Sequence, residues 1–243
     1  MKSLDTKITA ITGSGVSQSS GIPTFRGTNG LWKKYNVMDL ATPQAFARNP
    51  KLVWEWYYWR LGLVSQAKPN EAHLALENLE SSGYNIVVLT QNVDNLHERA
   101  GSSKVIHLHG EIFQRRCIQC HDITIWEPTE TFSNPEIPKC IKCNSMLRPK
   151  VVWFNETLNS EIIQFSYNRL KETDVLLIIG TSGIVYPVNN FPFIAKEGNM
   201  NLETYEFNLE LTPLSSETNK TILGPVEKTL PEFISKSFKI TKK

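Results

Sequence analysis

The sequence lacks any long apolar run, any large excess of charge and any tract of low complexity. No uninterrupted apolar stretch approaches the ~20 residues of a membrane-spanning helix, so we expect no membrane association. The formal net charge is only +2 at pH 7, whereas a nucleic-acid-binding protein normally carries a concentrated basic face. The opening MKSLDTKITAITG shows neither a signal-peptide apolar region nor an arginine-rich transit segment. These observations predict a cytoplasmic protein that binds neither nucleic acid nor membranes.

What the sequence does contain is an ordinary globular composition. Of its 243 residues, 40% are hydrophobic and 21% are charged, as in a typical soluble domain. This length predicts one sizeable core, with room for a smaller inserted module. We expect the protein to be a monomer.

Cysteine is scarce, and its spacing is informative. The four cysteines form two C-x2-C pairs separated by 19 residues: Cys117 with Cys120, and Cys140 with Cys143. Two such pairs can complete the tetrahedral shell of one Zn²⁺ ion and leave no open position for catalysis. Two disulfides are the alternative, which a reducing compartment disfavours. The spacing therefore predicts one structural zinc ion.

Four strands are predicted, over residues 8–12, 84–90, 104–108 and 174–180, because each is a buried-type apolar run. A helix could start within 39–43, and further helices are predicted near 52–61, 70–80 and 160–170. Strands alternating with helices indicate an α/β fold with a parallel sheet. In such sheets ligands bind beyond the carboxyl ends of the strands. Polar residues that follow the strands are therefore candidate site residues.

A glycine-rich turn follows the first predicted strand. Gly13-Ser14-Gly15 lets the backbone turn sharply and approach a ligand, and the next residues could open a helix whose N–H groups face a phosphate. The third glycine of the usual dinucleotide fingerprint comes only at Gly21, so the strict pattern fails. Phe25 and Arg26 follow in a stiffened loop, where an aromatic ring and a guanidinium could contact a heterocycle and a pyrophosphate.

Residues 8–27 resemble the cofactor loop of the sirtuins, which are NAD-dependent protein deacylases. The stretches 90–97 (TQNVDNLH) and 107–110 (HLHG) match the same family in the same order. The resemblance implies a parallel-sheet, Rossmann-like NAD-binding domain with a small inserted zinc-binding domain. The large part would comprise about 1–35, 84–110 and 148–243, and the small part about 36–83 (helical) and 111–147 (zinc module).

The resemblance also implies roles for individual residues. His109 would be the general base, which suits an imidazole pKa of ~6.5, and Asn92 would be the second catalytic residue. Without the resemblance, a histidine at this place is more often structural, and Asn92 and Asp94 could simply be turn or cap residues. His97 and His107 are interpreted as structural. The implied NAD-binding residues are Gly13, Ser14, Gly15, Ser17, Phe25, Arg26, Trp32, Gln91, Asn92, Asp94, Gly180, Thr181, Ser182, Asn208, Leu209, Glu210 and Val226.

The aromatic segment 54–60 is interpreted as the substrate-selecting helix. Tyr57 and Arg60 stand at i and i+3, so on a helix they share a face and could bind one carboxylate. Sirtuins that remove succinyl, malonyl or glutaryl groups have a similar Tyr-x-x-Arg pair, and Ala41 also matches those enzymes. An arginine here could instead be a surface residue. The tryptophans of the segment, at 54, 56 and 59, are expected in the core.

The resemblance implies that the acyl oxygen of a modified lysine attacks the nicotinamide ribose, and that nicotinamide and O-acyl-ADP-ribose are released. The peptide would lie as an extra strand between 152–154, including Val152 and Phe154, and 183–185. Two alternatives are an NAD hydrolase or ADP-ribosyltransferase using the same pocket, and a non-catalytic binding module. Two departures from the family pattern are Ser14, where alanine is usual, and Asn155, where glycine is usual; we expect activity despite them.

Overall fold

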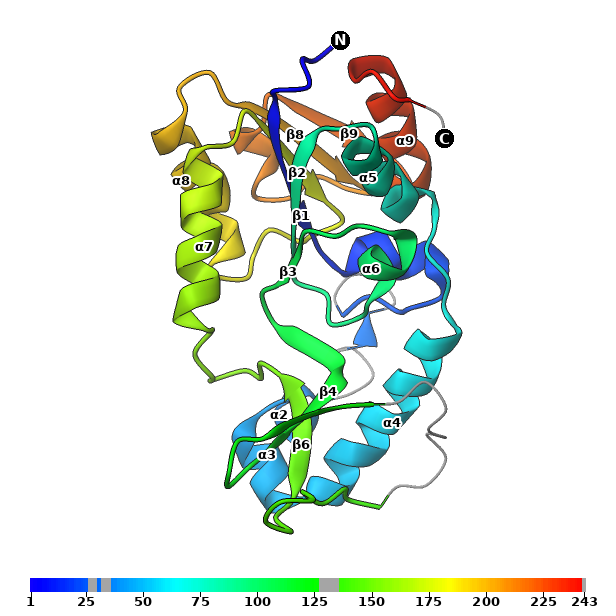
Figure 1. The fold of residues 1–243 in the computed structure, drawn as a ribbon, viewed down its shortest axis with the longest axis vertical. Coiled ribbons are helices and arrows are strands. Elements are labelled where there is room, and N and C mark those ends of the chain that lie inside the picture. The colour runs from blue at the N-terminus through cyan, green and yellow to red at the C-terminus, as the bar shows by residue number, and fades with distance from the viewer. Residues whose placement is uncertain (26–29, 32–35, 127–135, 242–243) are drawn as a thin grey trace.

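The computed structural model describes residues 1–25, 30–31, 36–126 and 136–241. Its centre is a parallel sheet of six strands in the order β3-β2-β1-β7-β8-β9 (Figure 1). The strands are β1 (Lys7–Thr12), β2 (Asn85–Thr90), β3 (Val105–His107), β7 (Val175–Ile179), β8 (Glu203–Asn208) and β9 (Lys220–Leu223). The three central strands β1, β2 and β7 are almost wholly buried, because helices cover both faces of the sheet.

Two pairs of helices form the outer layers (Figure 1). On one face, α5 (Glu71–Ser81) and α9 (Val226–Ser237) pack against side chains such as Ile8 and Ala10. On the other face, α7 (Ser160–Lys171) and α8 (Phe191–Gly198) share a core with Ile11. Asparagine caps begin two of these helices, since the side chains of Asn70 and Asn159 accept hydrogen bonds from the first turns of α5 and α7.

The register of the sheet brings three strand ends to one level. Thr12, the last residue of β1, lies opposite Thr90 of β2 and Ile179 of β7. Side chains that directly follow these strands therefore meet at one edge. Short helices occupy the connections: η1 (Ser14–Ser20), α6 (Leu96–Ala100), η2 (Val188–Asn190) and η3 (Ser215–Glu217).

A second layer of structure lies at one end of the sheet (Figure 1). It consists of α2 (Val37–Leu40), α3 (Pro43–Arg48), α4 (Pro50–Gln66) and an antiparallel sheet of β4 (Gly110–Cys117), β5 (Ile123–Ile125) and β6 (Leu147–Val151). Its core is aromatic: the Trp54 ring packs on Tyr58 and Trp126, and its indole N–H donates to the Leu147 oxygen at 3.0 Å. This bond ties α4 to β6.

The four strands predicted from the sequence are present as β1, β2, β3 and β7, and the predicted α/β parallel sheet is confirmed. Strands β8 and β9 and the antiparallel sheet were not predicted. One core prediction is wrong: Trp54 and Trp56 are buried, but Trp59 is 41% exposed. Trp59 shares one face of α4 with Leu52 and Glu55, which stand seven and four residues before it and are also exposed, so its ring points away from the core.

The proposed division of the chain into a large and a small part stays a prediction, and the packing refines one boundary. The apolar side chains of α5 lie in the core cluster of the six-stranded sheet, whereas α4 shares its cluster with the antiparallel sheet. We therefore propose that the helical portion of the small part ends near Gln66. Over the described ranges, the helices are all too short or too polar to cross a membrane.

Candidate functional site

Glycines join the ends of β1 and β7. The Gly15 N–H donates to the Gly180 oxygen at 2.9 Å. A β-carbon on Gly13 would lie 2.7 Å from that same oxygen, and one on Gly180 would lie 2.6 Å from the Val16 nitrogen. Gly180 also has φ +58°, which glycine adopts without strain. The glycines attributed to ligand approach are thus required by the contact of two backbones.

Ser17, Asn92 and Asp94 form one buried hydrogen-bonded group. The Asn92 amide donates to Ser17 Oγ at 3.0 Å, and Ser17 Oγ donates to Asp94 Oδ2 at 3.1 Å. The other Asp94 oxygen accepts the Leu96 N–H at the start of α6. Burial raises the Asp94 pKa, and the bonds from Leu96 and Ser17 oppose that rise. The structure thus brings together three of the predicted site residues from two separate segments.

His109 lies after β3 with its imidazole held by a backbone carbonyl. Its Nδ1 is 3.1 Å from the Gln91 oxygen. A carbonyl only accepts, so Nδ1 carries the proton and Nε2 keeps a lone pair. Burial lowers the His109 pKa below 6.5, despite the bond to Gln91. The ring is therefore neutral near pH 7 and can accept a proton.

Two other histidines, His107 and His97, contact residues at the ends of β1 and β2. His107 is within hydrogen-bond distance of the Asn92 oxygen through Nδ1 and of Glu98 Oε1 through Nε2, at 2.8 and 2.7 Å. Burial lowers the His107 pKa, but the Glu98 carboxylate outweighs burial and the net pKa is raised. His97 is fully buried beside Thr12, and burial holds its pKa well below 6.5. Both contacts fit the structural interpretation of these residues.

Further predicted NAD-binding residues follow β7 and β8. The Gln91 amide donates to Thr181 Oγ1 at 2.8 Å, and the Asn208 amide donates to the Thr181 oxygen at 2.8 Å. Ser182 is half-buried beside Thr181. Val226 is buried at the start of α9, while the loop after Asn208 is exposed at two further predicted residues, Leu209 and Glu210. Arg26 and Trp32 lie outside the described residues.

The predicted acyl pocket is built on α4. Tyr57 and Arg60 are only 2% and 5% exposed. The Arg60 guanidinium lies 4.7 Å from the centre of the Phe25 ring and 4.9 Å from that of Trp56. Burial lowers the Arg60 pKa, and the nearby Tyr57 and Asp94 counteract this. The alternative of a surface arginine is therefore wrong.

The predicted peptide edge adjoins both His109 and the acyl pocket. The Val152 N–H donates to the His109 oxygen at 2.8 Å, and the Phe154 N–H donates to the Ala41 oxygen at 2.9 Å. The intervening N–H, that of Trp153, donates to Glu156 Oε2. All three N–H groups are thus used within the protein. A peptide strand on this segment would have to donate to its carbonyl groups.

Sequence reasoning passed over Trp153. Its indole N–H donates to the Tyr57 hydroxyl oxygen at 2.9 Å. The available signal was its position between two residues assigned to the peptide edge, because neighbouring side chains of an extended segment point to opposite sides.

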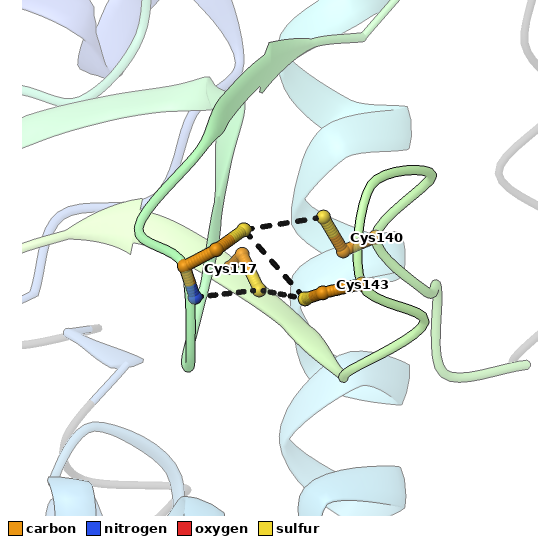
Figure 2. Close-up of side chains that lie close together, drawn as sticks. Cys117, Cys140 and Cys143 are labelled. Atoms are coloured by element: carbon orange, nitrogen blue, oxygen red, sulfur yellow. Dashed lines mark hydrogen bonds between the residues drawn. The ribbon is translucent and has the colours of Figure 1, made fainter.

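Cys117, at the end of β4, lies close to Cys140 and Cys143 (Figure 2), and Cys120 completes the cluster. Their sulfur atoms all lie within 4.8 Å of one another, and three of the separations are 3.4, 3.6 and 3.6 Å. A tetrahedral zinc ion with Zn–S bonds of ~2.3 Å places its sulfurs about 3.8 Å apart. Disulfide sulfurs would be ~2.05 Å apart. The cluster therefore fits a structural Zn²⁺ ion and excludes the disulfide alternative.

Known proteins share this architecture. A model of the Sir2 family matches residues 13–187. An NAD-dependent protein deacylase of Pyrococcus furiosus is 44% identical over 236 residues, which are 96% of this chain and 94% of that relative. The structure of a Sir2 homolog–NAD complex has a TM-score of 0.87 at 41% identity, covering 96% of this chain and 90% of its own. A Sir2–p53 peptide–NAD⁺ structure has a TM-score of 0.82 at 31% identity, covering 95% and 92%. The chain therefore belongs to the Sir2 family, the sirtuins.

Proposed function

We propose that this protein is an NAD-dependent protein lysine deacylase that removes acetyl groups and prefers acyl groups ending in a carboxylate, such as succinyl and malonyl. Family membership, the relative named as a protein deacylase and the solved complexes with NAD and peptide support the deacylase activity. The preference for an acidic acyl group rests on this chain's own residues.

One observation carries that preference: Arg60 is a buried cation for which the described residues provide no anionic partner. Among the described residues, no carboxylate forms an ion pair or hydrogen bond with the Arg60 guanidinium, although Arg60 is 5% exposed. A buried charge without a partner is costly. The nearby Tyr57 keeps its proton, because burial raises its pKa, and so adds an O–H donor. A guanidinium beside a hydroxyl is the donor set that a carboxylate requires.

NAD would supply the ribose carbon that the acyl oxygen attacks, with nicotinamide as the leaving group. We assign its binding to the ends of β1, β2, β7 and β8, including Gln91 and Asn92 for the ribose and Asp94 for the nicotinamide amide. Arg26 and Trp32 keep their proposed cofactor roles. The cysteine cluster would hold one zinc ion that supports the fold of the small part.

His109 is assigned as the general base. Its Nε2 lone pair would accept the proton of a ribose hydroxyl, and the carbonyl of Gln91 would hold the ring in the required tautomer. Because burial lowers its pKa, the ring is already neutral at pH 7 and need not lose a proton first.

The acylated peptide is proposed to pair with the carbonyl groups of residues 152–154 and with 183–185. Backbone pairing discriminates little between sequences, so the acyl group would provide most of the selectivity. Free thiolates persist in reducing compartments, and the zinc cluster therefore supports an intracellular enzyme. We propose that it acts as a cytoplasmic monomer.

The test compares nicotinamide release from NAD with succinyl-lysine, acetyl-lysine and unmodified peptides of one sequence. We expect succinyl peptide to be preferred, and Arg60→Met to reduce kcat/KM for it by at least about 30-fold while deacetylation changes by less than about threefold. Arg48→Met is the matched control, because Arg48 is an exposed arginine on the neighbouring helix α3.

Other results would select other functions. Preference for acetyl peptide, unchanged in Arg60→Met, would leave a plain deacetylase. Nicotinamide release that ignores the peptide would indicate an NAD hydrolase or ADP-ribosyltransferase. Absence of release with any peptide would indicate a non-catalytic binding module.

A further inference from the structure

Trp153 lies between the proposed peptide edge and the acyl pocket. It is the middle residue of the segment 152–154 and is only 3% exposed, whereas Phe154 is 40% exposed. The chain turns at Phe154 and Asn155, while the Trp153 indole N–H reaches the Tyr57 hydroxyl on α4. The same short segment thus presents a peptide edge on one side and an indole toward α4 on the other.

Arg148 and Phe46 both pack against the Trp153 indole. The Arg148 guanidinium lies 3.5 Å from the centre of the Trp153 ring, and the Phe46 ring lies 5.4 Å from it. Glu156 accepts two hydrogen bonds from Arg148, at 2.5 and 2.9 Å, and a third from the Trp153 backbone N–H at 2.8 Å. Ring position and backbone position are therefore fixed by the same ion pair. The direction of the indole N–H is fixed with them.

That N–H determines how the Tyr57 hydroxyl can act. An indole nitrogen only donates, so the Tyr57 oxygen is the acceptor in the 2.9 Å bond between them. The hydroxyl proton must then point away from Trp153. No acceptor for that proton occurs in the described part of the chain, although Tyr57 is 2% exposed. The arrangement leaves one O–H donor, of fixed direction, beside the Arg60 guanidinium.

We propose that Trp153 is a specificity-determining positioning residue: its indole N–H occupies the acceptor side of the Tyr57 hydroxyl and so directs the hydroxyl proton to the carboxylate of an acidic acyl group. This inference rests on the proposed function, because it concerns the same pocket. Trp153 itself does not touch the acyl carboxylate. It acts through Tyr57, and it has no such effect on an acetyl group, which offers no carboxylate.

The test replaces the indole by rings that lack the N–H. Trp153→Phe keeps an aromatic ring over Arg148, and benzothienylalanine at 153 keeps the bicyclic shape with sulfur in place of N–H. Each should raise KM for succinyl-lysine peptide by about 3- to 10-fold, the value of one hydrogen bond, with kcat retained and KM for acetyl-lysine peptide within about twofold. In a Tyr57→Phe background, the same replacements should cause no further change in the succinyl KM.

Trp54→Phe is the matched control. Its indole also donates a hydrogen bond within the same aromatic core, to the Leu147 oxygen, but it has no bond to Tyr57. It should lower the melting temperature and affect both substrates equally. If Trp153→Phe and the benzothienyl variant also affect both substrates equally, or keep their effect in the Tyr57→Phe background, the inference is overturned and Trp153 only packs the core.

The proposed acyl preference and the proposed role of Trp153 can fail separately. If the wild type prefers succinyl peptide and loses that preference in Arg60→Met, but both Trp153 variants behave as wild type, only this inference falls. If the wild type shows no preference for succinyl peptide, the proposed selectivity fails and the role of Trp153 falls with it.

Discussion

The proposed cofactor side and the proposed acyl side of the site differ in how their polar groups are paired. On the cofactor side, formed by the residues that follow β1, β2, β7 and β8, the polar groups bond to one another: buried Ser17 with Asp94, and half-buried Gln91 with Thr181. On the acyl side, formed by Tyr57, Arg60 and Trp153, burial is as deep, but a cation and a hydroxyl proton lack an acceptor among the described residues.

The difference teaches how selectivity can be recognised in a structure. A satisfied network holds its geometry before any ligand arrives, which suits a co-substrate shared by a whole family. An unsatisfied buried pair has a free-energy cost that only a complementary ligand removes. The proposed acyl selectivity therefore depends on Tyr57 and Arg60 and not on the network of the cofactor side.

Replacing the proposed base, which lies after β3 beside the cofactor side, should give the largest effect. His109→Ala is expected to lower kcat/KM for deacylation by about 10²- to 10⁴-fold, with the Kd for NAD changed by less than about threefold, because the Ser17 network remains. The base must be neutral, so in the wild type kcat/KM falls as pH falls through the lowered pKa. Its acid limb should therefore lie below pH 6.5.

Steady-state kinetics across pH and calorimetric NAD titration measure both quantities. An acid limb well above pH 6.5 would contradict the assignment, as would near-wild-type turnover in His109→Ala.

Removal of the metal should affect peptide binding more than NAD binding. The acyl side rests on α4, which is bonded to β6 beside the cysteine cluster, whereas the cofactor side rests on the six-stranded sheet. Chelation of zinc, or Cys140→Ser, is expected to weaken peptide binding by more than about tenfold and to lower the melting temperature by several degrees. NAD binding should change less.

Tryptophan fluorescence reports on structure outside the six-stranded sheet, because none of the tryptophans lies in a strand of that sheet. They stand at positions 32, 54, 56, 59, 126 and 153. Zinc added back should restore the signal. Equal loss of NAD and peptide binding would mean that the two sides do not fold independently of the metal.

The two departures from the family pattern should give the smallest effects. Asn155 has φ 69°, a left-handed conformation that asparagine tolerates better than most residues and glycine tolerates freely. Asn155→Gly should therefore change the free energy of unfolding by less than about 1 kcal/mol and leave the succinyl preference intact. Ser14→Ala should change KM for NAD by less than about twofold. Chemical denaturation and kinetics of both variants would reveal a larger role for either residue.

The sequence predicted those parts of the site that depend on local pattern. Apolar runs indicated β1, β2 and β7, and the residues after them were placed correctly at one edge because parallel strands end together. β8 escaped prediction because it contains Glu206, which is fully buried and accepts hydrogen bonds from Thr212, Ser215 and Thr221. Those hydroxyl groups are supplied by a later segment.

The hydrogen bond from Trp153 to Tyr57 could not be predicted from the sequence either. It joins residues 96 positions apart in the sequence, and its effect depends on which atom donates. Spacing on α4 could place Tyr57 and Arg60 on one face, but it could not show that both are buried and that the described part of the chain offers them no carboxylate partner.

The close backbone contact at the ends of β1 and β7 affects what the presence of these glycines in a related sequence can indicate. A side chain at Gly13 or Gly180 would strike the opposing backbone, whether or not a dinucleotide is present. A descendant that had lost all enzymatic activity would still be obliged to retain these glycines in order to fold. The glycine motif is thus a signature of architecture, inherited alike by active and inactive members. The proposed chemistry should instead be traced in relatives at His109, Asn92 and Arg60, the residues to which we assign it.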